Sequence, residues 1–140
     1  MASDAERVIY SGWLEADLDA EVRRLCLVYG WRYYHSYLSI RSTKGYPDLC
    51  LVRAPRVVFA ELKRQGGKPT EPRLAHDKRG YPRWIEGQTG WLRELAACPG
   101  VETYVWWPED VRDIATILDT GPAPEMPCHQ RMGAMLEDAR

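Results

Sequence analysis

The stretch from residue 45 to residue 63 reads GYPDLCLVRAPRVVFAELK, and it contains two apolar runs separated by a short polar segment. The first run, residues 47–52, starts with a proline, which belongs at the edge or the beginning of a strand. The second run, residues 57–63, is largely apolar, and its last residues alternate between apolar and charged. Residues 53–56 suit the turn of a β-hairpin. We therefore expect two neighbouring strands that pair through this turn.

A helix and another strand are expected before this hairpin. Residues 13–29 carry apolar side chains at three- and four-residue spacing, with acidic residues in the first turns, which predicts an amphipathic helix. Gly30 should end the helix, and the aromatic and β-branched residues 31–40 predict a strand before a polar turn at 41–46. The apolar stripe consists of Leu14, Leu18, Val22, Leu25 and Tyr29, and the first four of these are expected to lie in the core.

The chain after the hairpin begins with an aperiodic segment. Residues 64–87 are rich in Gly, Pro and charge, which predicts a long loop. Further regular elements are expected as helices at 88–97 and 108–118 and a strand at 102–107. The order α-β-β-β-α-β-α predicts a single α/β domain over residues 1–120, with helices flanking a mixed central sheet. The tail, residues 121–140, begins Pro-rich and is expected to be poorly ordered.

Composition limits the classes of protein that fit this chain. Its 140 residues have the length of one domain, and 45% hydrophobic with 28% charged residues excludes wholesale disorder. The apolar runs are too short to cross a bilayer, and the N-terminus resembles no secretory signal. No C-x-x-C pair occurs, which favours free thiols over a zinc site or a disulfide framework. We therefore expect a cytoplasmic protein without membrane contact.

Charge is segregated along the chain, although the net charge is only −1. Residues 53–83 hold nine basic and three acidic side chains. A basic middle of this kind could face a polyanion. A solvated loop rich in Arg and Lys gives the same pattern, so charge alone leaves both interpretations open.

Asp48, Glu61 and Lys63 stand out because they are ionisable and lie on the two hairpin strands. Asp48 is at the head of the first strand, and Glu61 and Lys63 are two residues apart, so their side chains project from the same face of the second. Two carboxylates with water suit a hard cation such as Mg²⁺ or Mn²⁺, and an adjacent ammonium group can orient an attacking water. A surface ion pair between Glu61 and Lys63 remains the alternative interpretation.

Several further motifs occur in order along the chain: Glu15, GW at 30–31, GYPDL at 45–49, VVFAELK at 57–63, Gln88 followed by WL at 91–92, and YVWWP at 104–108. Together these motifs resemble the VRR-NUC type of PD-(D/E)xK nuclease, from about residue 15 to residue 118. The resemblance implies a restriction-endonuclease-like fold. It also implies a small phage or prophage protein that cuts DNA, including branched structures such as Holliday junctions, with a divalent metal and as a homodimer.

The resemblance also assigns roles to individual residues. It implies that Asp48 and Glu61 are metal ligands, that Lys63 is the catalytic lysine, and that Gln88 sits near the scissile phosphate. Gln88 could instead bond its own helix backbone. The helix glutamate of the family matches Glu15, as a ligand directly or through water. Glu21 competes for that role, because both glutamates flank the apolar stripe, and spacing to Gly30 favours Glu15.

Basic and aromatic residues around this centre are candidates for binding a nucleic acid. Arg41 and Lys44 precede Asp48, and a strand phosphate would pass there if Asp48 binds the metal. Phosphate contact is favoured over the alternative of a simple polar turn. The 64–87 segment is longer than in the short family members, and its cations and rings suit phosphates and unpaired bases. A solvated loop is the competing interpretation. The predicted nucleic-acid-binding residues are Arg41, Lys44, Lys68, Arg73, Lys78, Arg79, Arg83 and Trp84. His35, within an aromatic strand, is expected to be packed or hydrogen-bonded.

The sequence therefore predicts a metal-dependent DNA endonuclease that uses Mg²⁺ or Mn²⁺ and no small-molecule cofactor. Its partners would be DNA and a second copy of the chain. The alternative functions are a non-catalytic module that binds DNA junctions or ends on a nuclease fold, and an interaction protein whose acidic tail and aromatic strand pack on a partner.

Overall fold

A computed structural model of the chain describes residues 2–37 and 43–122. The regular elements follow one another as α1 (Asp4–Ile9), α2 (Glu15–Tyr29), β1 (Arg32–His35), β2 (Leu49–Arg53), β3 (Arg56–Leu62), β4 (Arg73–His76), β5 (Pro82–Ile85), α3 (Gly87–Ala96), β6 (Val101–Trp106), the 3-10 turn η1 (Pro108–Asp110) and α4 (Val111–Asp119).

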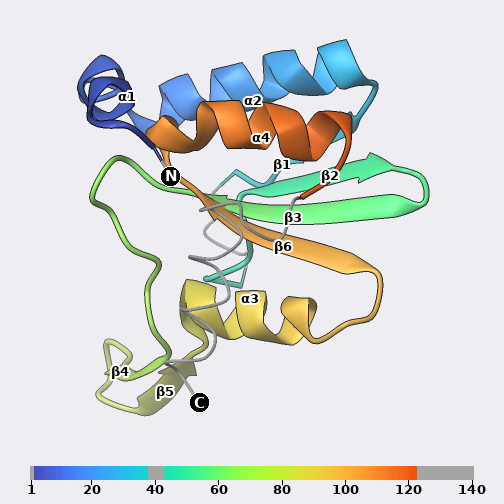
Figure 1. The fold of residues 1–140 in the computed structure, drawn as a ribbon. Helices are drawn as coiled ribbons and strands as arrows, with labels where there is room; N and C mark the ends of the chain where they lie inside the picture. Colours follow the sequence, from blue (N-terminus) through green and yellow to red (C-terminus); the bar gives the residue numbers. More distant parts are fainter. Residues whose placement is uncertain (1, 38–42, 123–140) are drawn as a thin grey trace.

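The main sheet has the strand order β1-β2-β3-β6. β1, β2 and β3 pair antiparallel, and β6 pairs parallel to β3 after a crossover through α3. Figure 1 shows α2 and α4 on one face of this sheet and α3 on the other. The prediction of an α/β fold with a mixed central sheet between helices is confirmed.

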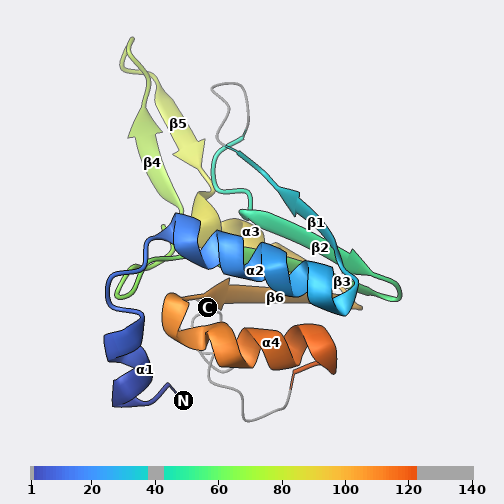
Figure 2. The same cartoon turned by 90° about the horizontal axis from the view of Figure 1, so that it is seen from above.

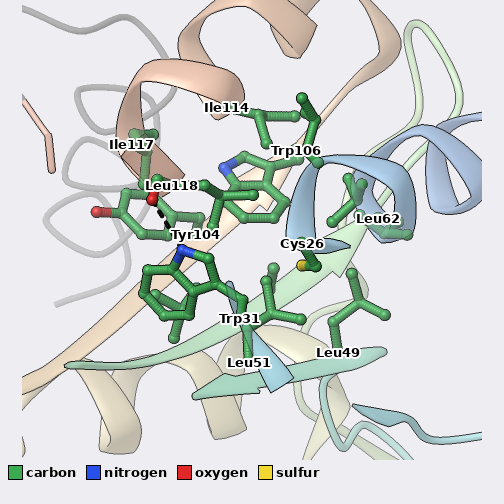
Figure 3. Packing of buried hydrophobic residues seen from close by; sticks show 14 of the residues in the cluster. Cys26, Trp31, Leu49, Leu51, Leu62, Tyr104, Trp106, Ile114, Ile117 and Leu118 are labelled. Atoms are coloured by element: carbon green, nitrogen blue, oxygen red, sulfur yellow. Dashed lines mark hydrogen bonds between the residues drawn. The ribbon is translucent and has the colours of Figure 1, made fainter. Parts of the chain in front are cut away.

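The hairpin of β2 and β3 occurs as predicted, with its turn closed by the pair Arg53 and Arg56. Its residues alternate between the two faces of the sheet. Leu49, Leu51, Val58, Ala60 and Leu62 face α2 and α4 and are at most 2% exposed. Figure 3 shows Leu49, Leu51 and Leu62 within the core that also contains aromatic rings and α4 side chains.

The opposite face of the sheet packs against α3 in a smaller cluster of Leu92, Val105 and Trp107. Glu61 lies beside Val105 in the register between β3 and β6. Because Glu61 alternates with Ala60 and Leu62, it points away from the main core and toward the α3 side. The Glu61 carboxylate is thereby buried on the α3 side of the sheet.

The amphipathic helix occurs as predicted, but one of its expected core positions is wrong. Leu18, Val22 and Leu25 are buried, whereas Leu14 is 64% exposed. Helix α2 begins only at Glu15, and Leu14 is its N-cap residue, whose backbone N–H donates to Asp17 at 2.8 Å. The apolar spacing starts one residue before the helix, at Leu14. Because this residue is outside the helix, its side chain is not directed toward the core.

The prediction of a loop over residues 64–87 is also wrong, because this segment contains the hairpin of β4 and β5. Its turn is held by Asp77, whose side chain accepts hydrogen bonds from the backbone N–H groups of Arg79 and Tyr81. Gly80 follows with a φ of +83°, a conformation that suits glycine. Strands of four residues with both faces exposed carry no hydrophobic period, so the pattern gives no signal for them.

Three smaller differences concern the ends of the chain and the first strand. Helix α1 is not predicted by the sequence pattern. Strand β1 covers Arg32–His35, while residues 38–40 of the expected strand lie outside the described residues. Most of the predicted tail, residues 123–140, lies outside the described residues. No helix among the described segments is both long and apolar enough to cross a membrane.

Candidate active site

Asp48 directly precedes β2 and is held there by hydrogen bonds to the chain segments of β3 and β1. Its Oδ2 accepts a hydrogen bond from the backbone N–H of Leu62 at 2.8 Å. Its own carbonyl accepts from the N–H of Ser36 at 2.8 Å, and the Ser36 hydroxyl donates to the carbonyl of Pro47 at 2.7 Å. The aspartate is therefore fixed between the ends of β1 and β3.

Glu61 is the most unusual ionisable residue of the sheet, because its side chain is 1% exposed. Its Oε1 accepts a hydrogen bond from Nε2 of Gln88 and lies 3.6 Å from Nζ of Lys63. Its Oε2 is buried and has no hydrogen-bond partner among the described residues. An unsatisfied carboxylate oxygen in an interior is costly, so something else is expected to bind it.

Burial, together with the negative charge of Asp48 nearby, raises the pKa of Glu61 to about 8, while Lys63 opposes the shift. Two carboxylates that repel one another in a buried place favour one of two outcomes. Either one of them binds a proton, or a cation binds between them. A strongly perturbed carboxyl group with a specific charge partner is also typical of functional sites.

Lys63 directly follows β3, and its side chain is 14% exposed. Its backbone N–H donates to the carbonyl of Trp106 at 2.9 Å, which extends the pairing of β3 with β6. The backbone of Lys63 is thus fixed at the end of β3, and its ammonium group lies beside Glu61. The predicted convergence of Asp48, Glu61 and Lys63 agrees with this geometry.

Gln88, the second residue of α3, bridges the site to the segment before β4. Its Nε2 donates to Glu61, and its Oε1 accepts from the backbone N–H of Thr70 at 3.0 Å. Its own backbone N–H donates to the Thr70 hydroxyl at 3.1 Å. The side chain therefore joins Glu61 to Thr70. The competing interpretation, in which Gln88 bonds the backbone of its own helix, is wrong.

Two glycines let three backbone segments meet around Gln88. Gly45, three residues before Asp48, has a φ of +92°, and a Cβ there would lie 2.5 Å from the carbonyl oxygen of Gly87. Gly87 has a φ of +68°, and a Cβ there would lie 2.5 Å from the carbonyl carbon of Glu71. Such distances leave no room for a side chain at either position. This close approach fixes the segment from Gly45 to Asp48 against the start of α3.

Glu15 is the one proposed ligand that the structure does not bring to this pair. It is the exposed first residue of α2. The ranges 2–37 and 43–122 hold no group of three or more His, Cys, Asp or Glu side chains placed to share a metal ion. The carboxylate set of the site is therefore Asp48 and Glu61, and the role of Glu15 stays a prediction.

The predicted nucleic-acid-binding residues fall into three groups. Lys44 and Lys68 are exposed on the segments that flank the site. Arg41 lies outside the described residues. The remaining members lie on the β4–β5 hairpin or in its turn, and all are exposed: Arg73, Lys78, Arg79, Arg83 and Trp84.

Sequence reasoning missed Thr70 and Glu71, which hold the hairpin against α3. The Glu71 carboxylate accepts from the hydroxyl of Thr89 at 2.9 Å and pairs with Arg93 at 2.9 Å. Neither residue stands in a periodic pattern, so no signal marks them. The prediction that His35 is hydrogen-bonded is confirmed, because its Nδ1 lies 3.1 Å from Oδ2 of Asp19.

Comparisons of the chain with protein-family models, with curated proteins and with solved structures found no match.

Proposed function

We propose that this chain is a divalent-metal-dependent deoxyribonuclease of the VRR-NUC type, and that it acts on branched or structured DNA as a homodimer. One observation carries the proposal: the buried Glu61 carboxylate lies beside Asp48 and 3.6 Å from the Lys63 ammonium group, at the ends of two paired strands. An acidic pair with an adjacent amine is the constellation that metal-assisted phosphodiester hydrolysis needs.

The fold supports the proposal at a coarser level. Three antiparallel strands follow α2, and α3 then crosses over to β6, which pairs parallel to β3. This order is compatible with the restriction-endonuclease-like fold that we propose for the domain. The fold alone would not specify an activity, which must be argued from the residues of the site.

The residues of the site fit a magnesium or manganese ion. Asp48 and Glu61 would hold it, because Mg²⁺ is bound in proteins through one or two carboxylates, with waters and substrate phosphates as the other ligands. The buried Oε2 of Glu61 lacks a partner among the described residues, as expected of a ligand atom. A bound divalent cation would supply Lewis-acid stabilisation of the phosphate and would lower the pKa of water.

The protein groups around the carboxylates have separate tasks in this proposal. The ammonium group of Lys63 would orient the attacking water and offset negative charge on the phosphate. Gln88 would position Glu61 through its hydrogen bond to Oε1. Hydrolysis forms a bond from the oxygen of water to phosphorus and breaks a phosphorus–oxygen ester bond. One product keeps the phosphate monoester, and the other gains a hydroxyl that carries a proton from the water.

The proposal is tested by incubating supercoiled plasmid and a four-way DNA junction with the protein in Mg²⁺ or Mn²⁺ and, separately, in EDTA. Wild type should cut with either metal and not in EDTA. Asp48→Asn, Glu61→Gln and Lys63→Ala should each lower the rate by at least about a hundredfold. Glu94→Gln, an exposed carboxylate on α3, and Arg24→Ala, an exposed cation on α2, are matched controls that should cut like wild type.

Equal cutting by wild type and the three site variants would overturn the assignment of the site. Tight DNA binding that is insensitive to EDTA, without cleavage under any metal condition, would instead favour the non-catalytic DNA-binding module.

A further inference from the structure

We propose that the β4–β5 hairpin is a two-sided nucleic-acid-binding ribbon, in which Leu74 and Trp84 hold an unpaired base and Arg73 and Arg83 bind backbone phosphates. The inference rests on the proposed function, because it specifies which feature of the substrate the same site would receive. The substrate would then carry unpaired nucleotides close to the bond that is cut.

The strand register divides the ribbon into two chemically different faces. Leu74 lies opposite Trp84, and Arg73 lies opposite Ile85. Because side chains alternate along each strand, Leu74 and Trp84 share one face, while Arg73 and Arg83 share the other. The indole ring of Trp84 and the side chain of Leu74 therefore lie on one side of the ribbon. The two guanidinium groups lie on the other side, together with Ala75 and Ile85.

The apolar face is open to solvent. Leu74 and Trp84 are each 59% exposed, and Tyr81 in the turn is 64% exposed. Figure 2 shows the hairpin extending away from the body formed by the main sheet and the helices. Neither Leu74 nor Trp84 belongs to a core cluster of the described residues. This cross-strand pair of large apolar side chains is therefore available to a partner.

Charge identifies the partner as a polyanion. Residues 73–85 contain four cationic side chains and one carboxylate, a net charge of +3. That carboxylate, Asp77, accepts hydrogen bonds within the turn from the backbone N–H groups of Arg79 and Tyr81. Aromatic rings interleaved with cations suit single-stranded nucleic acid, because bases stack on the rings while the cations follow the phosphates.

The ring of Trp84 is held in a defined orientation. Its Nε1 donates a hydrogen bond to Oε1 of Glu86 at 3.1 Å. This bond uses the polar edge of the indole ring, whereas stacking on a base uses a ring face. The orientation lowers the entropy lost when a base binds.

The base of the hairpin is joined to the candidate active site. Thr70 bonds Gln88, and Glu71 bonds Thr89 and Arg93. Trp84 is four residues before Gln88, so their Cα atoms are at most about 14 Å apart along an extended chain. At about 3.4 Å per nucleotide in one strand of B-DNA, this distance corresponds to about four nucleotides. A base held on Trp84 would thus lie within a few nucleotides of the carboxylates.

The test measures binding by fluorescence anisotropy in EDTA, so that no cleavage is required. The probes are a fluorescein-labelled 20-nucleotide oligothymidylate and a labelled 20-base-pair duplex, with the full-length protein. Wild type should bind the single strand more tightly than the duplex. Trp84→Ala should weaken single-strand binding about fivefold or more, whereas Trp84→Phe should retain most of it. Arg83→Ala should weaken binding of both probes and reduce the salt slope by about one.

Leu27→Ala is the matched control, since Leu27 is 81% exposed on α2, outside the hairpin, and the variant should bind both probes like wild type. The inference is overturned if Trp84→Ala leaves single-strand binding unchanged. It is also overturned if Trp84→Ala converts a dimer into a monomer in sedimentation, because the apolar face would then join two copies of the chain. Intact hairpin-dependent binding without any cleavage would overturn the proposed function alone.

Discussion

Gln88 donates a hydrogen bond from its side-chain amide to the buried carboxylate of Glu61, across 27 residues of sequence. The same side chain accepts a hydrogen bond from the backbone of Thr70. One residue at the start of α3 therefore links the acidic pair on the sheet to the segment that leads into the β4–β5 hairpin. The proposed chemistry depends on this link, because it sets the position of Oε1 of Glu61.

Replacing Gln88 tests that link directly. Gln88→Ala removes the donor to Glu61 and leaves the backbone N–H of Thr70 without its acceptor. We expect the half-saturating concentration of Mn²⁺ in DNA cleavage to rise by about tenfold or more, since a lost hydrogen bond to a charged group costs about 1.5–3 kcal/mol. Gln65→Ala is the control, because Gln65 donates to the carbonyl of Arg7, away from the carboxylates. An unchanged Mn²⁺ requirement in Gln88→Ala would contradict a positioning role.

The raised pKa of Glu61 predicts a pH-dependent stability of the cation-free protein. The folded protein keeps a proton on Glu61 up to about pH 8, whereas the unfolded chain releases it near the ordinary value of 4.5. The folded state thus binds more protons between these two values, so its stability should fall as pH rises from about 4.5 to 8. Urea unfolding in EDTA at pH 5, 6.5 and 8 measures this slope.

The matching variant for this measurement is Glu61→Gln, which stays neutral at every pH. Its stability should decline less than that of wild type over the same range. If the two proteins lose stability in parallel as pH rises, the titration of Glu61 is not the cause of the pH-dependent stability.

A divalent cation should compete with that proton. We expect Mn²⁺ to raise the Tm of wild type more at pH 8 than at pH 5.5, because the cation binds the deprotonated pair and stabilises only the folded state. The rise should disappear in Asp48→Asn and persist in Glu94→Gln. Differential scanning fluorimetry measures all three proteins. A rise in Tm of the same size in Asp48→Asn would place the bound ion elsewhere.

Gly45 offers a test of the backbone contact that fixes the segment from Gly45 to Asp48. Gly45→Ala combines a φ of +92° with a Cβ at 2.5 Å from the carbonyl oxygen of Gly87. The strained backbone alone costs of the order of 1–3 kcal/mol, and the clash adds to it by displacing the residues before Asp48. We expect a lower free energy of unfolding in urea together with slower cleavage.

Gly12→Ala is the control for that substitution, since a Cβ at Gly12 would meet no atom within 4 Å and the residue has no positive φ. Its unfolding free energy should change little. Wild-type stability in Gly45→Ala would show that the close approach to Gly87 can relax without cost.

The sequence predicts those parts of the fold that depend on local patterns. The β2–β3 hairpin follows from two apolar runs and the turn at Arg53–Arg56, and Asp48, Glu61 and Lys63 could be brought together because they lie on that one hairpin. The prediction for Leu14 is wrong because an apolar period does not show where a helix begins.

The rest of the site depends on contacts between distant segments. Thr70 meets Gln88 from 18 residues away, in a stretch without any period. The contact between Gly45 and Gly87 depends on the path of the backbone, and two glycines in a sequence do not show that their backbones will meet. The β4–β5 hairpin is stabilised by its turn and cross-strand pairs, and because it contributes nothing to the core, it has no apolar pattern.

The measurement that tests the central claim most directly is anomalous X-ray scattering from a crystal soaked in Mn²⁺ at pH 8. We predict a peak about 2.0–2.2 Å from carboxylate oxygens of both Asp48 and Glu61, and its loss in Glu61→Gln crystals. A map without a peak between these two side chains, or with manganese bound only elsewhere, would contradict the claim that they hold the metal of a nuclease.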